Sequence, residues 1–242
     1  MPVNEYFLVR ELSGAGCTTH QRRRGVAAHD EFQDWTNTMT RTNELGQPIG
    51  DALPAGWQPP PAPSRPILQG MRVRVEPLDP ERHIVDLFEA NNLDQSGAGW
   101  TYLLAGPFAD LAEYRNWMET SCMGDDPMFS AYIDLATGKA VGLGSYLRIT
   151  PSAASIEVGH LRFSPKLQRT PLSTEAMYLM MKHAFDLGYR RYEWKCDALN
   201  APSRAAAERY GFKFEGVFRQ ALHYRGRNRD TAWFSITDKE WP

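Results

Sequence analysis

The residues whose types and spacing most clearly suggest a binding or catalytic role lie in one segment, from Glu157 to Ala176. An alternating strand ends there near Ser164, a short basic loop with Arg169 follows, and a helix is expected to start near Ser173. The first N–H groups of a helix lack partners within the helix and carry the positive end of its dipole, so such a start suits an anion such as pyrophosphate. An ordinary capped helix would show the same pattern, and both interpretations stay open on this segment alone.

A second segment with polar residues at defined spacing runs from Asn200 to Gly216. Asn200 is a suitable N-cap for a helix that ends at Gly211, and Ser203 falls in the first turn of that helix. Taken alone, the two side chains could serve the helix or contact a ligand.

Together and in this order, the two segments resemble the GNAT superfamily, and more closely its branch of ribosomal-protein alanine N-acetyltransferases. In that branch a Glu-x-Gly strand leads to an Arg/Gln-x-x-Gly-x-Gly/Ala loop ending in Thr-Glu-Ala, and an Asn-x-x-Ser helix precedes Gly-Phe-x-x-Glu-Gly. Here the loop runs from Gln168 to Ser173, and Pro171 replaces the family's glycine. Proline has no N–H to donate to phosphate, although it fits the first turn of a helix. The resemblance covers Ile67 to Trp241.

The resemblance implies an acetyl-CoA-dependent N-acetyltransferase, in which a primary amine of a small molecule or a peptide N-terminus attacks the thioester directly. It implies Glu157 as the general base and a backbone N–H near Phe163 as the oxyanion donor. It also implies Ser203 as the acid, directly or through a water, because Ala207 stands where many members carry a tyrosine. The residues expected to bind the donor are Phe163, Gln168, Arg169, Thr170, Pro171, Leu172, Ser173, Thr174, Asn200, Ser203 and Arg204.

The alternation of the strand before the loop places Glu157 on one sheet face with Gly159 and Leu161, and His160 on the other. Glu193 and His160 are the weaker candidates for the base. A covalent mechanism through Cys196 lacks a histidine in the same motif that could activate the thiol. Tyr210 is assigned to the core.

Two functions of other classes remain as alternatives. The chain could be a non-catalytic acyl-CoA-binding sensor or scaffold, since Pro171 and the missing tyrosine depart from the enzyme pattern. The run Pro60-Pro61-Ala62-Pro63 could dock on an SH3-like or WW-like partner, although a spacer suits its position better. The aromatic residues of 100–108 could line an acceptor pocket or pack in the core.

Residues 67–242 are expected to form an α+β domain with the GNAT-like acyl-CoA N-acyltransferase fold. Its mixed, mostly antiparallel twisted sheet would be flanked by helices and splayed between the family's fourth and fifth strands. The expected order is strand 71–77, helix from 79 or 80, helix 109–122, hairpin 127–150, strand 155–163, helix 173–187, strand 192–196, helix 200–211, and strands 213–224 and 230–236 joined by a turn at 225–229.

Residues 1–66 are expected to be an extension with little periodicity, in which a proline-rich linker occupies 54–66 and Met39 is an alternative start. A net charge of −2 gives no general reason to expect nucleic acid or a membrane surface as partner. The three cysteines fit neither a disulfide framework nor a metal spacing, and we expect a cytoplasmic protein with reduced thiols. A homodimer is left open.

Overall fold

The computed structural model describes residues 41–242 of the chain. The chain divides into two units, Met1–Trp57 and Gln58–Pro242, with the division inside the proline-rich stretch. The described part of the first unit contains a two-stranded antiparallel sheet of β1 (Arg41–Thr42) and β2 (Pro48–Ile49). The expectations for residues 1–40, including Met39 as an alternative start, lie outside the described residues.

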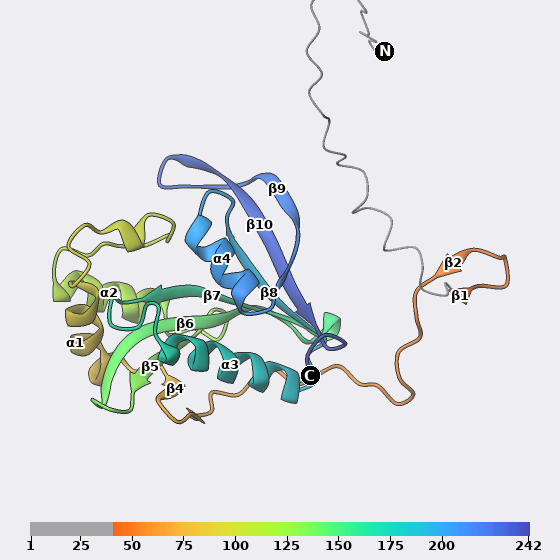
Figure 1. Cartoon of the computed structure of the whole chain (residues 1–242), viewed down its shortest axis with the longest axis horizontal. Helices are drawn as coiled ribbons and strands as arrows, with labels where there is room; N and C mark the ends of the chain where they lie inside the picture. The colour runs from red at the N-terminus through yellow and green to blue at the C-terminus, as the bar shows by residue number, and fades with distance from the viewer. Residues whose placement is uncertain (1–40) are drawn as a thin grey trace, which may run out of the picture. The chain divides into compact units, whose positions relative to one another are not determined.

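The second unit is an α+β fold around an eight-stranded sheet, as expected for the GNAT fold (Figure 1). All neighbouring strands are antiparallel except β7 and β8, which are parallel. In sheet order the strands are β3 (Leu68–Gln69), β4 (Val73–Pro77), β5 (Met128–Asp134), β6 (Lys139–Thr150), β7 (Ser155–Phe163), β8 (Arg191–Asp197), β10 (Arg227–Thr237) and β9 (Lys213–Tyr224). The helices are α1 (Pro80–Asn91), α2 (Leu111–Ser121), α3 (Pro171–Asp186) and α4 (Ala201–Arg209), with short 3-10 turns η1 (Ala98–Trp100) and η2 (Pro151–Ala153).

Hydrophobic side chains form one core on each face of the sheet. Helices α1 and α2 supply Ile84, Leu87 and Met118 to one core, and α3 and α4 supply Met177 and Ala207 to the other. Each helix therefore covers the sheet with one apolar stripe, the usual way in which an amphipathic helix is stabilised. No helix within residues 41–242 is both long enough and apolar enough to cross a membrane.

The sequence signals for helix starts correspond to real caps. Asp79 Oδ1 accepts a hydrogen bond from Glu81 N at 3.0 Å and begins α1, with Pro80 in the first position. The start of α3 differs from the expectation: the helix begins at Pro171 and its N-cap is Thr170, two residues before the expected start at Ser173. Proline at the first helical position loses no bond, because the N–H of that position has no partner within the helix anyway.

The sheet opens between β7 and β8, the expected splay. Their parallel pairing runs from Ser155↔Arg191 to Val158↔Trp194, after which both strands continue without pairing to each other. At the far end of the chain, β9 and β10 form a longer hairpin than expected, because Arg225 and Gly226 alone make its turn, with φ of 50° and 70°.

Candidate active site

One cavity of about 620 Å³ passes through the region where β7 and β8 separate. Its walls come from residues 98–104, the end of β6, the middle of β7 and β8, the loop before α3, and α4. We call the loop before α3 and the start of α4, where the sequence resemblance places the acyl donor, the donor side of the cavity. Residues 98–104 and Arg148, which also line the cavity, are called the acceptor side.

The donor side contains an unusual helix start. Thr170 Oγ1 accepts a hydrogen bond from Ser173 N at 3.4 Å, and Ser173 Oγ donates to Thr170 O at 2.7 Å. The hydroxyl of Ser173 is therefore used within the first turn of α3. In the described part of the chain, the N–H groups of Arg169, Thr170 and Leu172 donate to no protein acceptor, so they are available to an anion.

The expected donor-binding residues divide into two groups by position. Those that line the cavity are Phe163, Gln168, Arg169, Ser173, Asn200 and Ser203. Those outside its walls are Thr170, Pro171, Leu172, Thr174 and Arg204. The residues of the second group could contact a ligand in the cavity only through backbone atoms or at its rim. Among them, Arg204 Nη1 donates a hydrogen bond to Ala198 O at 3.2 Å.

Several of these side chains also have structural partners. Gln168 Nε2 donates to Phe163 O at 2.8 Å and ties the loop to the end of β7. Asn200 Oδ1 accepts from Ser203 N at 3.1 Å, as an N-cap does. Ser203 Oγ accepts from Trp194 Nε1 at 3.1 Å, and its hydroxyl also hydrogen-bonds with the Cys196 thiol.

Glu175, the glutamate of the Thr-Glu-Ala sequence, holds a turn of the fold. Its carboxylate accepts hydrogen bonds from the backbone N–H groups of Met71, Arg72 and Val73 at 2.8, 2.8 and 3.0 Å. Burial alone would raise the pKa of Glu175, but these three donors keep that pKa below its usual value. This residue fixes α3 against the start of β4.

Glu157 lines the cavity and is 3% exposed. Its Oε2 receives Arg148 Nη1 at 2.7 Å and Lys195 Nζ at 2.8 Å. Lys195 Nζ also contacts Glu193 Oε2 at 2.7 Å and lies 3.7 Å from the centre of the Trp233 ring. Both cations use the same oxygen of Glu157, so neither occupies Oε1.

Glu193, the weaker candidate for the base, is enclosed by cations. Arg191 Nε donates to its Oε1 at 2.6 Å, and Lys195 binds the other oxygen. Burial opposes ionisation, but these two partners hold the pKa of Glu193 below its usual value. Glu157 is bound by two cations as well, so position separates the two carboxylates: Glu157 lines the cavity and Glu193 does not.

Arg148 reaches Glu157 from a distorted part of β6. Its φ is +46°, in the left-handed region, and the register between β6 and β7 shifts between Leu147 and Thr150. The carboxylate of Asp126 stabilises this conformation by accepting from Arg148 N at 2.8 Å and from Ile149 N at 3.0 Å. The side chain of Arg148 is 55% exposed, in contrast to the buried Lys195.

A second bulge changes the face on which His160 lies. The residue has a φ of +50°, and the pairing of β6 with β7 shifts between Ser145 and Leu143. His160 Nδ1 lies 2.8 Å from Ser145 Oγ, on the same sheet face as Glu157, so the expected placement on the opposite face was wrong. Leu161 moves to the other face for the same reason and packs in the core with α3.

The environment of His160 favours its neutral form. Burial, followed by the nearby charge of Arg148, lowers the pKa of this imidazole below its usual value. His160 is therefore neutral at neutral pH, and its hydrogen bond to Ser145 gives it a structural partner.

Comparison with known proteins decides the family. The model of the acetyltransferase (GNAT) domain matches residues 72–213, more than half of the chain. The chain belongs to the GNAT acetyltransferase family. It is therefore an acetyltransferase enzyme by family, and the cavity described above lies where a GNAT fold opens its sheet. No curated protein sequence matches the chain.

Solved GNAT structures are similar to this chain over most of its length. A GCN5-related N-acetyltransferase from Brucella melitensis is 47% identical, with a TM-score of 0.75 over 77% of this chain and 85% of that one. A protein described as a probable GNAT acetyltransferase from Chromobacterium violaceum is 40% identical, with a TM-score of 0.74 over 81% and 98%. An acetyl transferase from Salmonella typhimurium that modifies the N-terminal serine of ribosomal protein L7/L12 is 18% identical, with a TM-score of 0.58 over 71% and 99%, and shows the shared fold alone.

The acceptor side of this GNAT domain is closed by residues 98–104, which we call the roof segment. Arg162, 2% exposed on β7, supports it from below: its guanidinium lies 4.2 Å from the centre of the Trp100 ring and 3.3 Å from Asp94 Oδ2. The Trp100 ring also packs edge-on against Phe108, so these two aromatic residues belong to the packing. Tyr102 is the aromatic side chain of the roof segment that lines the cavity.

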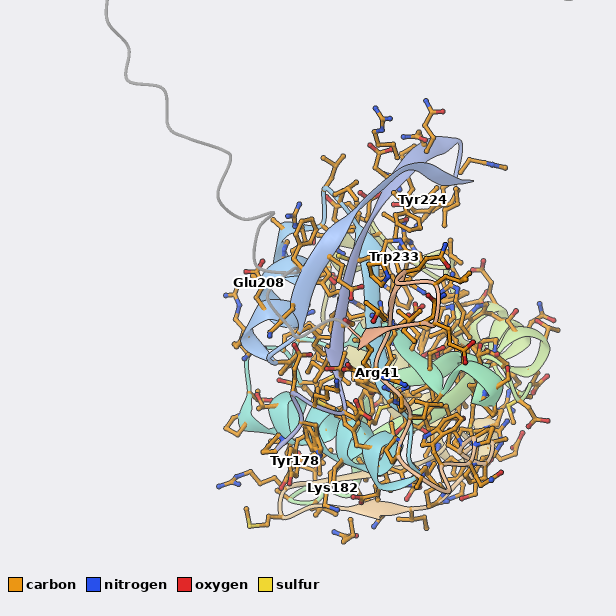
Figure 2. All side chains as sticks on the ribbon, turned by 90° about the vertical axis from the view of Figure 1, so that its right-hand side faces the viewer. Arg41, Tyr178, Lys182, Glu208, Tyr224 and Trp233 are labelled. Carbon is orange, nitrogen blue, oxygen red and sulfur yellow. The ribbon has the colours of Figure 1, made fainter. Side chains whose placement is uncertain are left out.

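The roof segment is also tied from above by the β9–β10 hairpin. Arg225 Nη1 donates to Trp100 O at 3.0 Å, and Arg227 Nη2 donates to Thr101 O at 2.8 Å. Figure 2 shows Tyr224 near the free end of this hairpin, with Trp233 further along β10. Arginine donors of the hairpin and the ring contact of Arg162 thus hold the roof segment, and Tyr102 of the segment itself donates to Leu199 O at 3.1 Å.

Two further residues of α4 and β8 bear on the chemistry. Tyr210 packs against the core, as expected, but it also lines the cavity, and its buried hydroxyl has no protein partner. Burial raises the pKa of the Cys196 thiol, so the thiolate needed for covalent catalysis is disfavoured.

The sequence did not point to Arg148, Lys195, Arg162 or the roof tethers. Lys195 does alternate with Glu193, and this spacing was the available signal that the two side chains share a face. The other residues depend on bulges and on contacts between segments far apart in the sequence, for which the local pattern carries no signal.

Proposed function

We propose that this GNAT enzyme transfers the acetyl group of acetyl-CoA to a primary amine by direct attack. The observation that carries the proposal is the continuity of the cavity, which joins Arg169, whose N–H has no protein acceptor, to Glu157. The donor side fits the phosphates of CoA through Arg169 and the neighbouring N–H groups of Thr170 and Leu172. The acceptor side offers Oε1 of Glu157 to an ammonium group.

In the proposed reaction Glu157 accepts a proton from the ammonium, and the free amine nitrogen then attacks the thioester carbonyl carbon. A carbon–nitrogen bond forms, the carbon–sulfur bond breaks, and the departing thiolate takes a proton, while the second proton that the nitrogen loses as the amide forms replaces the one given to sulfur. Ser203 is the proposed proton donor, directly or through a water, because it lines the cavity and accepts, rather than donates, in its hydrogen bond with Trp194. A backbone N–H near Phe163, at the end of the splayed strand, is the proposed oxyanion donor.

The acceptor is proposed to be a small amine or a peptide N-terminus. Support for a peptide comes from the Salmonella typhimurium protein, which has the same fold and modifies an N-terminal serine. We further propose that residues 67–242 are sufficient for catalysis and that the protein acts in the cytoplasm. A homodimer remains a prediction.

A thiol-release assay with acetyl-CoA and a panel of amines and short peptides tests the proposal. Glu157→Gln should lower kcat by at least about a hundredfold, the usual contribution of a general base, and leave the affinity for CoA intact. Unchanged turnover in this variant would show that the base is another group. Binding of CoA with no turnover of any acceptor would favour the sensor alternative, and no binding of CoA would exclude both functions.

A further inference from the structure

We propose that Arg148 determines acceptor specificity. With Glu157 it forms a pair of opposite charges that recognises an α-aminoacyl end, a primary ammonium with a carbonyl or carboxylate oxygen on the adjacent carbon. The inference rests on the proposed function and deepens it, since it names the acceptor class. The acceptor would be an amino acid derivative or a peptide N-terminus, and not an amine without such an oxygen.

The backbone of Arg148 is held in a conformation that directs its side chain to the cavity. A left-handed φ is unfavourable for a residue with a Cβ atom, and it persists only where the surroundings enforce it. Here Asp126 enforces it with both carboxylate oxygens, at 2.8 Å to Arg148 N and 3.0 Å to Ile149 N. Bulges of this kind are found beside active sites, where they redirect a side chain.

The guanidinium of Arg148 keeps hydrogen-bonding capacity for a ligand. A guanidinium has about five N–H donors, and the hydrogen bond of this side chain to Glu157 uses Nη1. The side chain is 55% exposed and lines the acceptor side of the cavity. Lys195, the other cation on Glu157, is 5% exposed and already bonded to Glu193, so it cannot serve an incoming molecule in the same way.

The spacing of the two charged groups matches the acceptor class. Arg148 Nη1 and Glu157 Oε2 are 2.7 Å apart, and Oε1 of Glu157 carries neither cation. In an α-aminoacyl group the nitrogen and the carbonyl oxygen are separated by roughly 3 Å, as standard bond lengths and angles dictate. An ammonium on Oε1 therefore brings the adjacent oxygen within reach of the guanidinium, where a charge-assisted hydrogen bond forms.

A matched pair of acceptors isolates this contact. Alaninamide and sec-butylamine share a methyl group on the carbon that bears the amine, but the second carries an ethyl group in place of the carboxamide. Arg148→Gln should lower kcat/KM for alaninamide about tenfold more than kcat/KM for sec-butylamine, the effect of one lost charge-assisted hydrogen bond. A change that comes from the lost contact with Glu157 is common to both acceptors and cancels in this ratio. Arg148→Lys should fall between, because lysine keeps the charge and loses the planar fork.

Two more variants separate recognition from general damage. Asp126→Ala keeps the guanidinium of Arg148 but removes the hydrogen bonds that hold the backbone of Arg148 and Ile149. This variant should therefore lower kcat/KM for alaninamide more than kcat/KM for sec-butylamine, as Arg148→Gln does. Arg190→Gln removes a surface arginine that pairs with Asp238 and should leave both acceptors unaffected. Melting curves check that each variant is folded.

The outcomes distinguish this inference from the function on which it rests. Equal changes of kcat/KM for both acceptors in Arg148→Gln, or a larger loss for sec-butylamine, would overturn the inference while acetyl transfer to amines stood. Turnover of sec-butylamine without turnover of alaninamide or short peptides would do the same. If no amine of either kind were acetylated, the proposed function itself would fail.

Discussion

Replacing Lys195 with methionine tests whether the buried charges around Glu157 act as one unit. The substitution removes the ammonium and keeps an unbranched side chain of similar length. Lys195 lies 2.8 Å from Glu157 and 2.7 Å from Glu193, and all three side chains are buried or nearly so. At an effective dielectric constant of about 20, each contact is a Coulomb attraction of roughly 6 kcal/mol, which the cost of removing the ions from water largely offsets.

The net loss follows from what each carboxylate keeps. Removing one partner of a buried ion pair costs about 3–5 kcal/mol, because a charge is left uncompensated. Glu157 retains Arg148 and Glu193 retains Arg191, so we expect the lower end, a loss of about 3 kcal/mol in the free energy of unfolding at neutral pH. Urea denaturation followed by tryptophan fluorescence measures it. Lys182→Met is the control, because Lys182 pairs with Asp186 on the exposed side of α3 (Figure 2) and its loss should cost at most about 0.5 kcal/mol.

The pH dependence provides a second, independent check. The pKa of Glu193 is lowered in the folded state, so the stability that its ionisation contributes is present above the usual value of 4.5 and is lost as the pH falls through the native pKa. Lys195→Met removes part of that contribution. The difference in unfolding free energy between wild type and variant should therefore be full at about pH 7 and smaller at about pH 4. A difference under about 1 kcal/mol at neutral pH, or one that widens on acidification, would refute the reasoning.

Four further variants probe residues in and beside the cavity. Pro171→Ala adds an N–H at the first position of α3 and should lower the KM for acetyl-CoA about tenfold, the low end for one hydrogen bond to a charged group. An unchanged KM would place the phosphates elsewhere. The pKa of the buried His160 imidazole is lowered in the folded state, so the stability linked to its neutral form is full above the usual pKa of histidine and is lost as the pH falls to the native pKa. His160→Gln should therefore lose less melting temperature than the wild type between about pH 7.5 and about pH 5.5. Ser203→Ala should lower kcat at least tenfold and Tyr210→Phe should leave it near the wild-type value; the opposite result in steady-state kinetics would make Tyr210 the proton donor.

Much of the fold followed from local patterns in the sequence. The strand expected at 155–163 has those bounds in the structure, and the caps at Asp79 and Asn200 begin α1 and α4. These features depend on alternation and on single capping side chains, which a sequence displays directly. The start of α3 was displaced because Thr170, Ser173 and Thr174 all suit a cap, and the position of the proline decides among them.

The site was less accessible from the sequence, for a physical reason. The face on which a strand residue lies depends on every residue before it, so one left-handed residue reverses the assignment of those that follow. His160 and Leu161 changed faces in this way, and Arg148 gained its contact with Glu157 through a similar bulge. The roles proposed for Glu157 and Ser203 remain predictions for the assays above.

The hydrogen bonds that tie the roof segment have a consequence for how this enzyme can change over time. Arg225 and Arg227 donate to main-chain carbonyls, which every amino acid provides. Side chains such as those of Leu103 and Leu104, which line the cavity, can therefore be exchanged without loosening the tether. Mutational drift in the roof segment would alter which acceptors are admitted while its anchorage persists. A recombinant that inherited the roof segment without the hairpin would lose the anchorage, so the two segments should be exchanged together in attempts to redesign the acceptor range.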